Sequence, residues 1–248
     1  MAAAADAKLT DKPGAWVDLA LTLPIFVIYQ LGVVFLDVQN GTDVVTGQLM
    51  TLAHGDRTTY LGMTVGIGAV FALVFVILGR GHAFRTSKFI QIAIEGTAYA
   101  VLMRVGAALF VQQFFLGAAV KDQGRMVGFI MSLGAGFYEE LAFRVLLYGV
   151  GAKVLVWLFA KQQVGVVGDG AKSFSFRSIL IMIGWSLVAA AMFSGIHYVG
   201  SLADSFTLVS FAFRFALGVL LTLIFVTRGF AAAVWTHTVY DLWILVLR

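Results

Sequence analysis

The chain has 248 residues, of which 60% are hydrophobic and 12% are charged, and its formal net charge is +4. Soluble domains carry about 25% charged residues, so the composition predicts an all-α protein that crosses a membrane several times, and the absence of strand-like alternation excludes a β-barrel. The sequence has no cysteine, which excludes disulfides and thiolate sites, and its excess of basic residues fits cytoplasmic loops rather than nucleic-acid binding.

Seven apolar stretches approach or exceed the roughly 20 residues that a membrane-spanning helix needs. In chain order they cover about Trp16–Leu36, Tyr60–Leu78, Phe89–Val120, Met126–Ala160, Ile179–Val199, Phe206–Val226 and Gly229–Leu247. The first stretch is too long for a signal-peptide core and no small-residue cleavage site ends it, so we expect it to be retained. Together they predict one membrane domain, with helices 1–3 in residues 1–125 and a core of four helices in residues 126–248.

Two segments of this pattern need separate interpretation. The polar segment Asp37–Thr59 is interpreted as a loop, in which Asn40-Gly41-Thr42 fits a glycosylation acceptor, although such tripeptides are common by chance. The stretch Met126–Ala160 is too long for one straight span. Because Gly134 and Gly136 offer a break, we expect a short interfacial piece, followed by a helix from about Phe137 to Ala160.

The basic residues favour a cytoplasmic N-terminus. With that orientation the inner segments hold ten of them: Lys8, Lys12, Arg80, Arg85, Lys88, Lys153, Lys161, Lys172, Arg177 and Arg228. The outer segments hold four: Arg57, Lys121, Arg125 and Arg248. The positive-inside rule therefore predicts an integral protein of the plasma membrane with its N-terminus inside. In this topology Glu139, His197 and His237 can meet in the outer half of the membrane.

Two adjacent carboxylates and an arginine interrupt the fourth apolar stretch, where each charge costs about 2.5–3.5 kcal/mol to insert. The spacing of four places Glu140 and Arg144 on one helix face. Glu139 is rotated by about 100° from Glu140 and is left without a partner in the helix, which suits a general base. A lone Glu-Arg pair in a span is more often structural than catalytic, and Glu95, Arg104 and Arg214 are placed in that structural class.

Two of the four histidines lie in apolar spans, whereas His54 and His82 lie in loops and are interpreted as solvated. His197 follows Phe193 by four residues, and His237 precedes Asp241 by four, so each pair shares a helix face. One imidazole across from Glu139 can orient a water molecule, and a second can donate to a developing oxyanion. The combination predicts hydrolysis of a peptide bond within the membrane.

Three motifs thus occur in order on three separate apolar spans. They are Glu139-Glu140-x-x-x-Arg144, Phe193-x-x-x-His197 and His237-x-x-x-Asp241. Together with the lead-in from Gly136, they resemble the CPBP family over about Met126–Leu247. This family contains CAAX prenyl endopeptidases and bacterial bacteriocin-processing and immunity proteins, and its active members are glutamate-type intramembrane proteases. Each motif alone is weakly specific, whereas the three in order are a strong signal.

The resemblance implies a role for each motif. Glu139 and His197 would activate water, and Glu140, Arg144 and Phe193 would support them. His237 and the residue at position 241 would stabilise the oxyanion. The prenyl proteases have Asn at this last position and the present chain has Asp241, which donates a hydrogen bond only when protonated. The alternative is that Asp241 orients His237 as an acceptor.

The expected partners are the lipid bilayer and a protein or peptide substrate. A prenylated CAAX substrate is cytosolic, whereas the predicted site opens outward. The topology therefore favours a bacterial member that acts on an exported or membrane-anchored protein, and the myxosortase branch resembles such an enzyme. The sequence does not indicate the oligomeric state.

Other functions remain open from the sequence alone. A non-enzymatic immunity or scaffold protein of the same fold is the main alternative, and an ion-coupled transporter that uses the carboxylates as a relay ranks third. We expect no cofactor, although Glu139, His197 and His237 could together bind zinc. Adjacent glutamates do not resemble the helical metalloprotease pattern, in which two histidines flank one glutamate.

Overall fold

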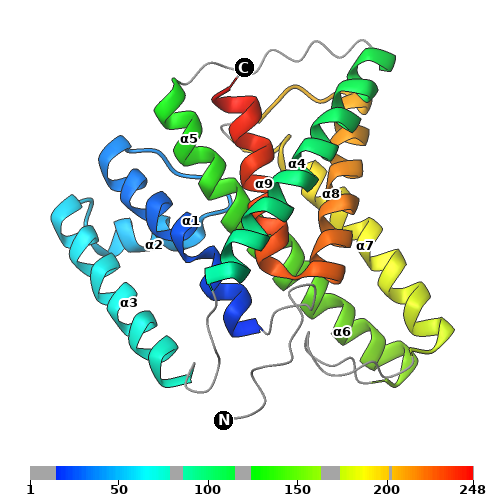
Figure 1. Cartoon of the computed structure of the whole chain (residues 1–248), viewed down its shortest axis with the longest axis horizontal. Helices are drawn as coiled ribbons and strands as arrows, with labels where there is room; N and C mark the ends of the chain where they lie inside the picture. Colours follow the sequence, from blue (N-terminus) through cyan, green and yellow to red (C-terminus); the bar gives the residue numbers. More distant parts are fainter. Residues whose placement is uncertain (1–14, 79–85, 115–123, 163–173, 201–202, 248) are drawn as a thin grey trace.

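The computed structural model is a bundle of helices around a central C-terminal helix (Figure 1). The structure describes residues 15–78, 86–114, 124–162, 174–200 and 203–247. All regular elements within these ranges are helical. The helices are α1 (Ala15–Leu36), α2 (Val44–Leu52), α3 (Arg57–Leu78), α4 (Thr86–Phe114), α5 (Arg125–Gly134), α6 (Gly151–Leu155), α7 (Phe176–Ile196), α8 (Leu208–Arg228) and α9 (Phe230–Leu245).

Four helices in the described part of the chain are long and apolar enough to cross a membrane. They are Val17–Leu36, Arg125–Ala160, Phe176–Ile196 and Leu208–Arg228. The chain is therefore an integral membrane protein with several candidate spans, whereas the predicted count of seven is not confirmed. Helices α3, α4 and α9 occupy the other three predicted stretches, and the end of the third stretch, from residue 115 to 120, lies outside the described residues.

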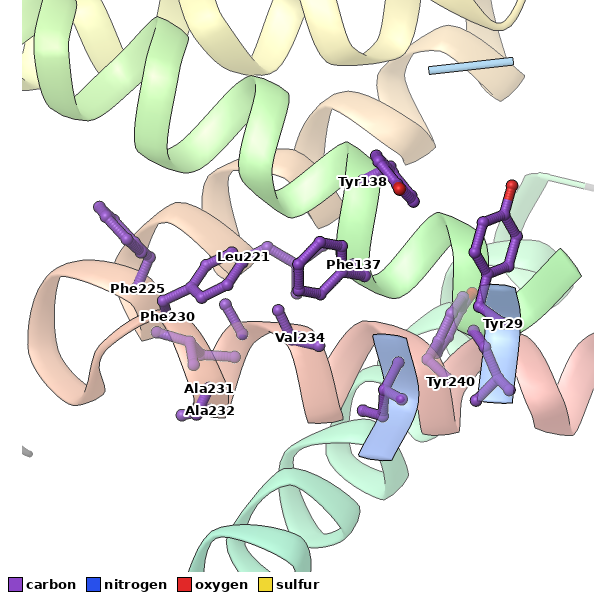
Figure 2. Close-up of a cluster of buried hydrophobic side chains, with 14 of the residues drawn as sticks. Tyr29, Phe137, Tyr138, Leu221, Phe225, Phe230, Ala231, Ala232, Val234 and Tyr240 are labelled. Carbon is purple, nitrogen blue, oxygen red and sulfur yellow. The ribbon is translucent and has the colours of Figure 1, made fainter. Parts of the chain in front are cut away.

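Helix α9 lies at the centre of the bundle and packs against α1, α4, α5 and α8 (Figure 1). Its first turns present Ala231, Ala232 and Val234 to the core, and all three are fully buried. Small side chains let neighbouring helices approach closely, which is the usual basis of helix packing in membranes. In Figure 2 the ring of Phe137 extends toward these residues, and its centroid lies 5.8 Å from that of Phe230.

The beginning of α9 is fixed by a residue from the opposite end of the chain. Asp18, near the start of α1, accepts hydrogen bonds from the backbone N–H groups of Phe230 and Ala231. The preceding residue, Gly229, has a φ of +99°, a conformation that side-chain-bearing residues rarely adopt. A carboxylate on the first amides of a helix satisfies free donors and complements the helix dipole. The first and last helices are thus joined by a buried cap.

The predicted break at Gly134 and Gly136 is wrong, because the helix continues from Arg125 to Ala160. Gly134 keeps right-handed helical angles, with φ −63° and ψ −48°. These glycines serve close packing instead: a Cβ on Gly134 would collide with Tyr29, and one on Gly136 would lie 2.9 Å from the backbone nitrogen of Thr238. The helix departs from α geometry in three wider, π-helical segments: Ala135–Glu139, Leu141–Val150 and Val156–Ala160.

The predicted loop between the first two spans contains a helix of its own, α2, which the sequence interpretation missed. Asp43 caps it by accepting a hydrogen bond from the backbone N–H of Thr46. The chain before α2 folds back along α1, because the N–H of Asn40 donates to the hydroxyl of Tyr29, about two helical turns before the end of α1 at Leu36. Its residues Asn40 and Asp43 are buried within protein, the condition under which irregular backbone is tolerated at membrane depth.

Candidate functional site

Glu139 and Glu140 lie where the first π-helical segment ends, and both are buried, with Glu140 fully so. In a regular α-helix two adjacent side chains diverge by about 100°. A π-helical turn bonds residue i to i+5 and so contains more residues, which reduces the rotation between neighbours. Both carboxylates consequently reach the same side chain on α9, His237. Insertions of this kind inside α-helices are frequent at functional sites.

The imidazole of His237 lies between three carboxylates. Its Nδ1 is 2.7 Å from Oε1 of Glu140, while its Nε2 is 3.5 Å from Oδ2 of Asp241 and 4.0 Å from Oε2 of Glu139. An ionised carboxylate can only accept, so Nδ1–H donates to Glu140 and fixes the orientation of the ring. The Nε2 atom is therefore the one that faces Glu139 and Asp241.

Arg144 balances the charge of Glu140 from within the same helix. Its Nε lies 3.1 Å from Oε2 of Glu140, and the side chains of both residues are almost completely inaccessible. The guanidinium also lies over the ring of Phe193, 4.2 Å from the centroid, in a cation–π contact. The predicted pair at a spacing of four is thus present, and Glu140 divides its two oxygens between Arg144 and His237.

The second histidine of the predicted set, His197, follows directly after α7. Its Nδ1 is 2.9 Å from the carbonyl oxygen of Phe193, so Nδ1–H donates and Nε2 remains available. Phe193 packs edge-on against both imidazoles, with centroid distances of 5.3 Å to His197 and 5.9 Å to His237. His197 interacts electrostatically with Glu139 and His237, but in the described structure it forms no hydrogen bond or ion pair with Glu139.

The structure adds one residue that the sequence interpretation did not place at the site. Nδ2 of Asn40 donates to Oε1 of Glu139 at 3.2 Å, and Asn40 is only 6% exposed. This residue belongs to the tripeptide that was noted as a glycosylation acceptor, and its amide is engaged inside the protein. The sequence contains one signal for such a segment. Tyr29 and Gln30 are polar residues within the apolar span of α1, and buried polar groups require hydrogen-bond partners from elsewhere in the chain.

Two other charged residues of the apolar stretches form ion pairs that do not include His237. Glu95 on α4 forms an ion pair with Arg228 at the end of α8, consistent with the structural role expected for it. Arg214 on α8 donates to the hydroxyl of Tyr198 and pairs with Asp204 at 2.5 Å.

The remaining predictions concern loop histidines and metals. His54 is exposed and adopts a φ of +51°, whereas the prediction for His82 lies outside the described residues. Among the residues that the structure describes, no group of three or more His, Asp or Glu side chains is arranged to hold a metal ion. The zinc alternative stays a prediction.

Comparison with known families identifies the C-terminal half. Residues 121–243 match the family model described as type II CAAX prenyl endopeptidase Rce1-like. The chain belongs to the CPBP family. The matched range begins just before α5 and contains the motif residues Glu139, Glu140, Arg144, Phe193, His197, His237 and Asp241. Asn40 lies outside it. With the apolar helices, CPBP membership indicates a membrane-embedded peptidase of the CAAX-protease type. No curated protein and no solved structure matches the chain.

Proposed function

We propose that this CPBP protein is a glutamate-type intramembrane endopeptidase that hydrolyses a peptide bond in a membrane-associated or exported protein. The observation that carries the proposal is the environment of His237, whose Nδ1 is held by Glu140 while Nε2 faces Glu139 and Asp241. A purely structural histidine needs only one partner. Here a second carboxylate, Glu139, is held nearby by a separate donor, which is the arrangement that acid–base chemistry requires.

In the proposed reaction Glu139 is the general base. Its Oε2 forms no hydrogen bond within the described structure, whereas its Oε1 accepts from Asn40. Oε2 would take a proton from water as the water oxygen bonds to the carbonyl carbon of the substrate. His197, with Nε2 available, would orient that water. When the C–N bond of the tetrahedral intermediate breaks, Glu139 returns the proton to the leaving amine.

His237 would stabilise the negative charge that develops on the carbonyl oxygen. As an imidazolium it would present Nε2–H, which is 4.0 Å from Oε2 of Glu139, close enough for both atoms to act on one peptide bond. Glu140 would hold the ring in this orientation and Arg144 would balance the charge of Glu140. Asp241 would act as an acceptor that keeps Nε2–H in place. The scheme requires no metal ion.

The orientation proposed for the chain places the N-terminus in the cytoplasm and the site toward the outside, in a bacterial plasma membrane. That orientation favours exported or membrane-anchored proteins over cytosolic prenylated ones as substrates.

The test compares native cells with cells that carry Glu139→Gln, by mass spectrometry of protein N- and C-termini. This substitution keeps the shape of the side chain and removes the base. Glu95→Gln is the matched control, because Glu95 is also a glutamate in an apolar helix but pairs with Arg228 instead of His237. Uncleaved membrane or exported proteins in the Glu139→Gln cells alone would support the proposal and identify the substrate. Unchanged termini in cells that contain the folded variant would reject it in favour of a non-enzymatic role.

A further inference from the structure

The segment that folds back between α1 and α2 reaches the carboxylate assigned as the base. Asn40 is the contact point, and its N–H group donates to the hydroxyl of Tyr29. Tyr29 in turn donates to Oδ2 of Asp43, whose Oδ1 caps α2 through the N–H of Thr46. The backbone around Asn40 is therefore held on both sides by buried hydrogen bonds, which is what a residue needs in order to fix the position of another side chain.

The orientation of the Asn40 amide follows from its neighbours. The backbone N–H of Thr42 lies 2.9 Å from one end of the amide, and the hydroxyl of Thr42 lies 2.6 Å from the same atom. A backbone N–H can only donate, so that atom is the carbonyl oxygen of the amide. The NH₂ group must then face Glu139. The contact at 3.2 Å is consequently a donation from Asn40 to Oε1 of Glu139.

This contact gives the two carboxylate oxygens of Glu139 different environments. Oε1 accepts from Asn40, while Oε2 is buried without a hydrogen-bond partner in the described residues and lies 4.0 Å from Nε2 of His237. A carboxylate with one oxygen held cannot rotate to exchange the two. Oε2 is thus the oxygen that faces His237 on α9.

We infer that Asn40 is a positioning residue of the peptidase, which holds Glu139 so that Oε2 is the atom that accepts the proton of the attacking water. The inference rests on the function proposed above. It assigns a part of the site to residues 37–43, which lie outside the range that matches the family model. The N-terminal helices then contribute to the chemistry as well as to anchoring.

The test uses the full-length protein in lipid nanodiscs and an internally quenched peptide that contains the bond identified in the Glu139→Gln comparison. Asn40→Asp is the informative variant, because it keeps the shape and the acceptor for Thr42 but replaces the donating NH₂ with an oxygen. Misplacing a catalytic group can cost about 10²-fold in rate. We expect Asn40→Asp to lower kcat by about that factor, with KM changed less than about twofold, because Asn40 acts on the base and not on the bound peptide.

Thr46→Val is the matched control for stability. Thr46 is buried in the first turn of α2, directly after the folded-back segment, and its hydroxyl lies 3.5 Å from the side-chain oxygen of Gln30. A merely structural role for Asn40 would lower the unfolding temperature in both variants and leave kcat per folded molecule unchanged in both. Positioning lowers kcat in Asn40→Asp alone. Equal kcat values for Asn40→Asp and the unmodified protein, with Glu139→Gln inactive, would overturn the inference and leave the proposed function intact.

Two further outcomes are informative. If Asn40→Asp does not fold, Thr42→Val takes its place, since it removes one of the two donors that orient the amide. A loss in kcat of about threefold or more with this variant supports the positioning role, and an unchanged kcat rejects it. If the unmodified protein cuts no peptide and alters no termini in cells, the proposed function fails, and the role of Asn40 fails with it.

Discussion

Glu140 holds His237 through one carboxylate oxygen and Arg144 through the other, at 2.7 Å and 3.1 Å. Glu140 and His237 are 97 positions apart in the sequence, on the helix that contains the double glutamate and on α9. A single buried carboxylate thus links a charge-balancing partner within its own helix to a ring on the central helix. Glu140 therefore affects both the stability of the protein and the orientation of the His237 ring. Substitutions can separate these two effects.

We expect Arg144→Leu to destabilise the fold by about 3–5 kcal/mol, because it leaves the charge of Glu140 buried without compensation. Thermal unfolding of the purified protein in detergent measures the effect. Peptidase activity should fall as well, because the uncompensated carboxylate shifts relative to His237.

The double variant Glu140→Leu, Arg144→Leu provides the control. Replacement of a complete buried ion pair by apolar residues is often neutral or stabilising, so the unfolding temperature should recover most of the loss. Activity should stay low, since Nδ1 of His237 has lost its acceptor. A double variant that is both stable and fully active would show that Glu140 does not orient His237.

Gly136→Ala should disturb the contact between the double-glutamate helix and α9. The added methyl group would collide with the side chain of Thr238 and lie 2.9 Å from its backbone nitrogen, an atom that cannot move without α9. Overpacking of this kind costs about 1–3 kcal/mol, and His237 directly precedes Thr238 on α9. Unfolding temperature and kcat should therefore both fall.

Gly184→Ala on α7 is the matched substitution, because nothing lies within 4 Å of the added Cβ. Alanine is the better helix former by roughly 1 kcal/mol, so this variant should be as stable as the unmodified protein or more so, with equal activity. Equal losses in Gly136→Ala and Gly184→Ala would contradict a specific role for the close approach to Thr238.

Asp18→Ala should weaken the start of α9, since the N–H groups of Phe230 and Ala231 lose their acceptor. Loss of a helix cap costs about 0.5–2 kcal/mol, measurable as a lower unfolding temperature. Asp18→Asn retains one acceptor oxygen and should lose less. Hydrogen exchange of the first amides of α9 should rise in the same order, and an unchanged exchange rate in Asp18→Ala would argue against the cap.

Peptidase activity should survive removal of metal ions, because the proposed chemistry uses only carboxylates and imidazoles. The check is the rate of peptide cleavage after prolonged incubation with a strong chelator, followed by dialysis. Loss of activity that zinc restores would instead assign Glu139, His197 and His237 to a metal.

The sequence predicted the part of the site that depends on short-range helical spacing. Glu140 and Arg144 are four residues apart, as are His237 and Asp241, and both pairs are in contact. The link between Glu140 and His237 was not foreseen, because Glu140 was already assigned to Arg144. The sequence also did not predict the π-helical segment Ala135–Glu139. Glycines at 134 and 136 are compatible with a helix break and with a continuous helix, and only their packing partners decide between the two.

The residues of the segment before α2 do not by themselves predict its role, for a different physical reason. Polar residues in a short connection are usually solvated, and nothing in residues 37–43 distinguishes a surface loop from one that turns inward. The inward course depends on partners in distant elements, the hydroxyl of Tyr29 on α1 and the carboxylate of Glu139. Only the three-dimensional arrangement brings them together.

The cap from Asp18 to Phe230 spans 212 positions of the chain. Proteins are synthesised from the N-terminus, so the acceptor enters the membrane long before the amides that it binds. His237 and Asp241 follow those amides, which means that a nascent chain has the two glutamates but none of the groups that α9 brings to them. The site therefore cannot be assembled until α9 has been synthesised, and a nascent chain without α9 holds its two glutamates apart from His237 and Asp241.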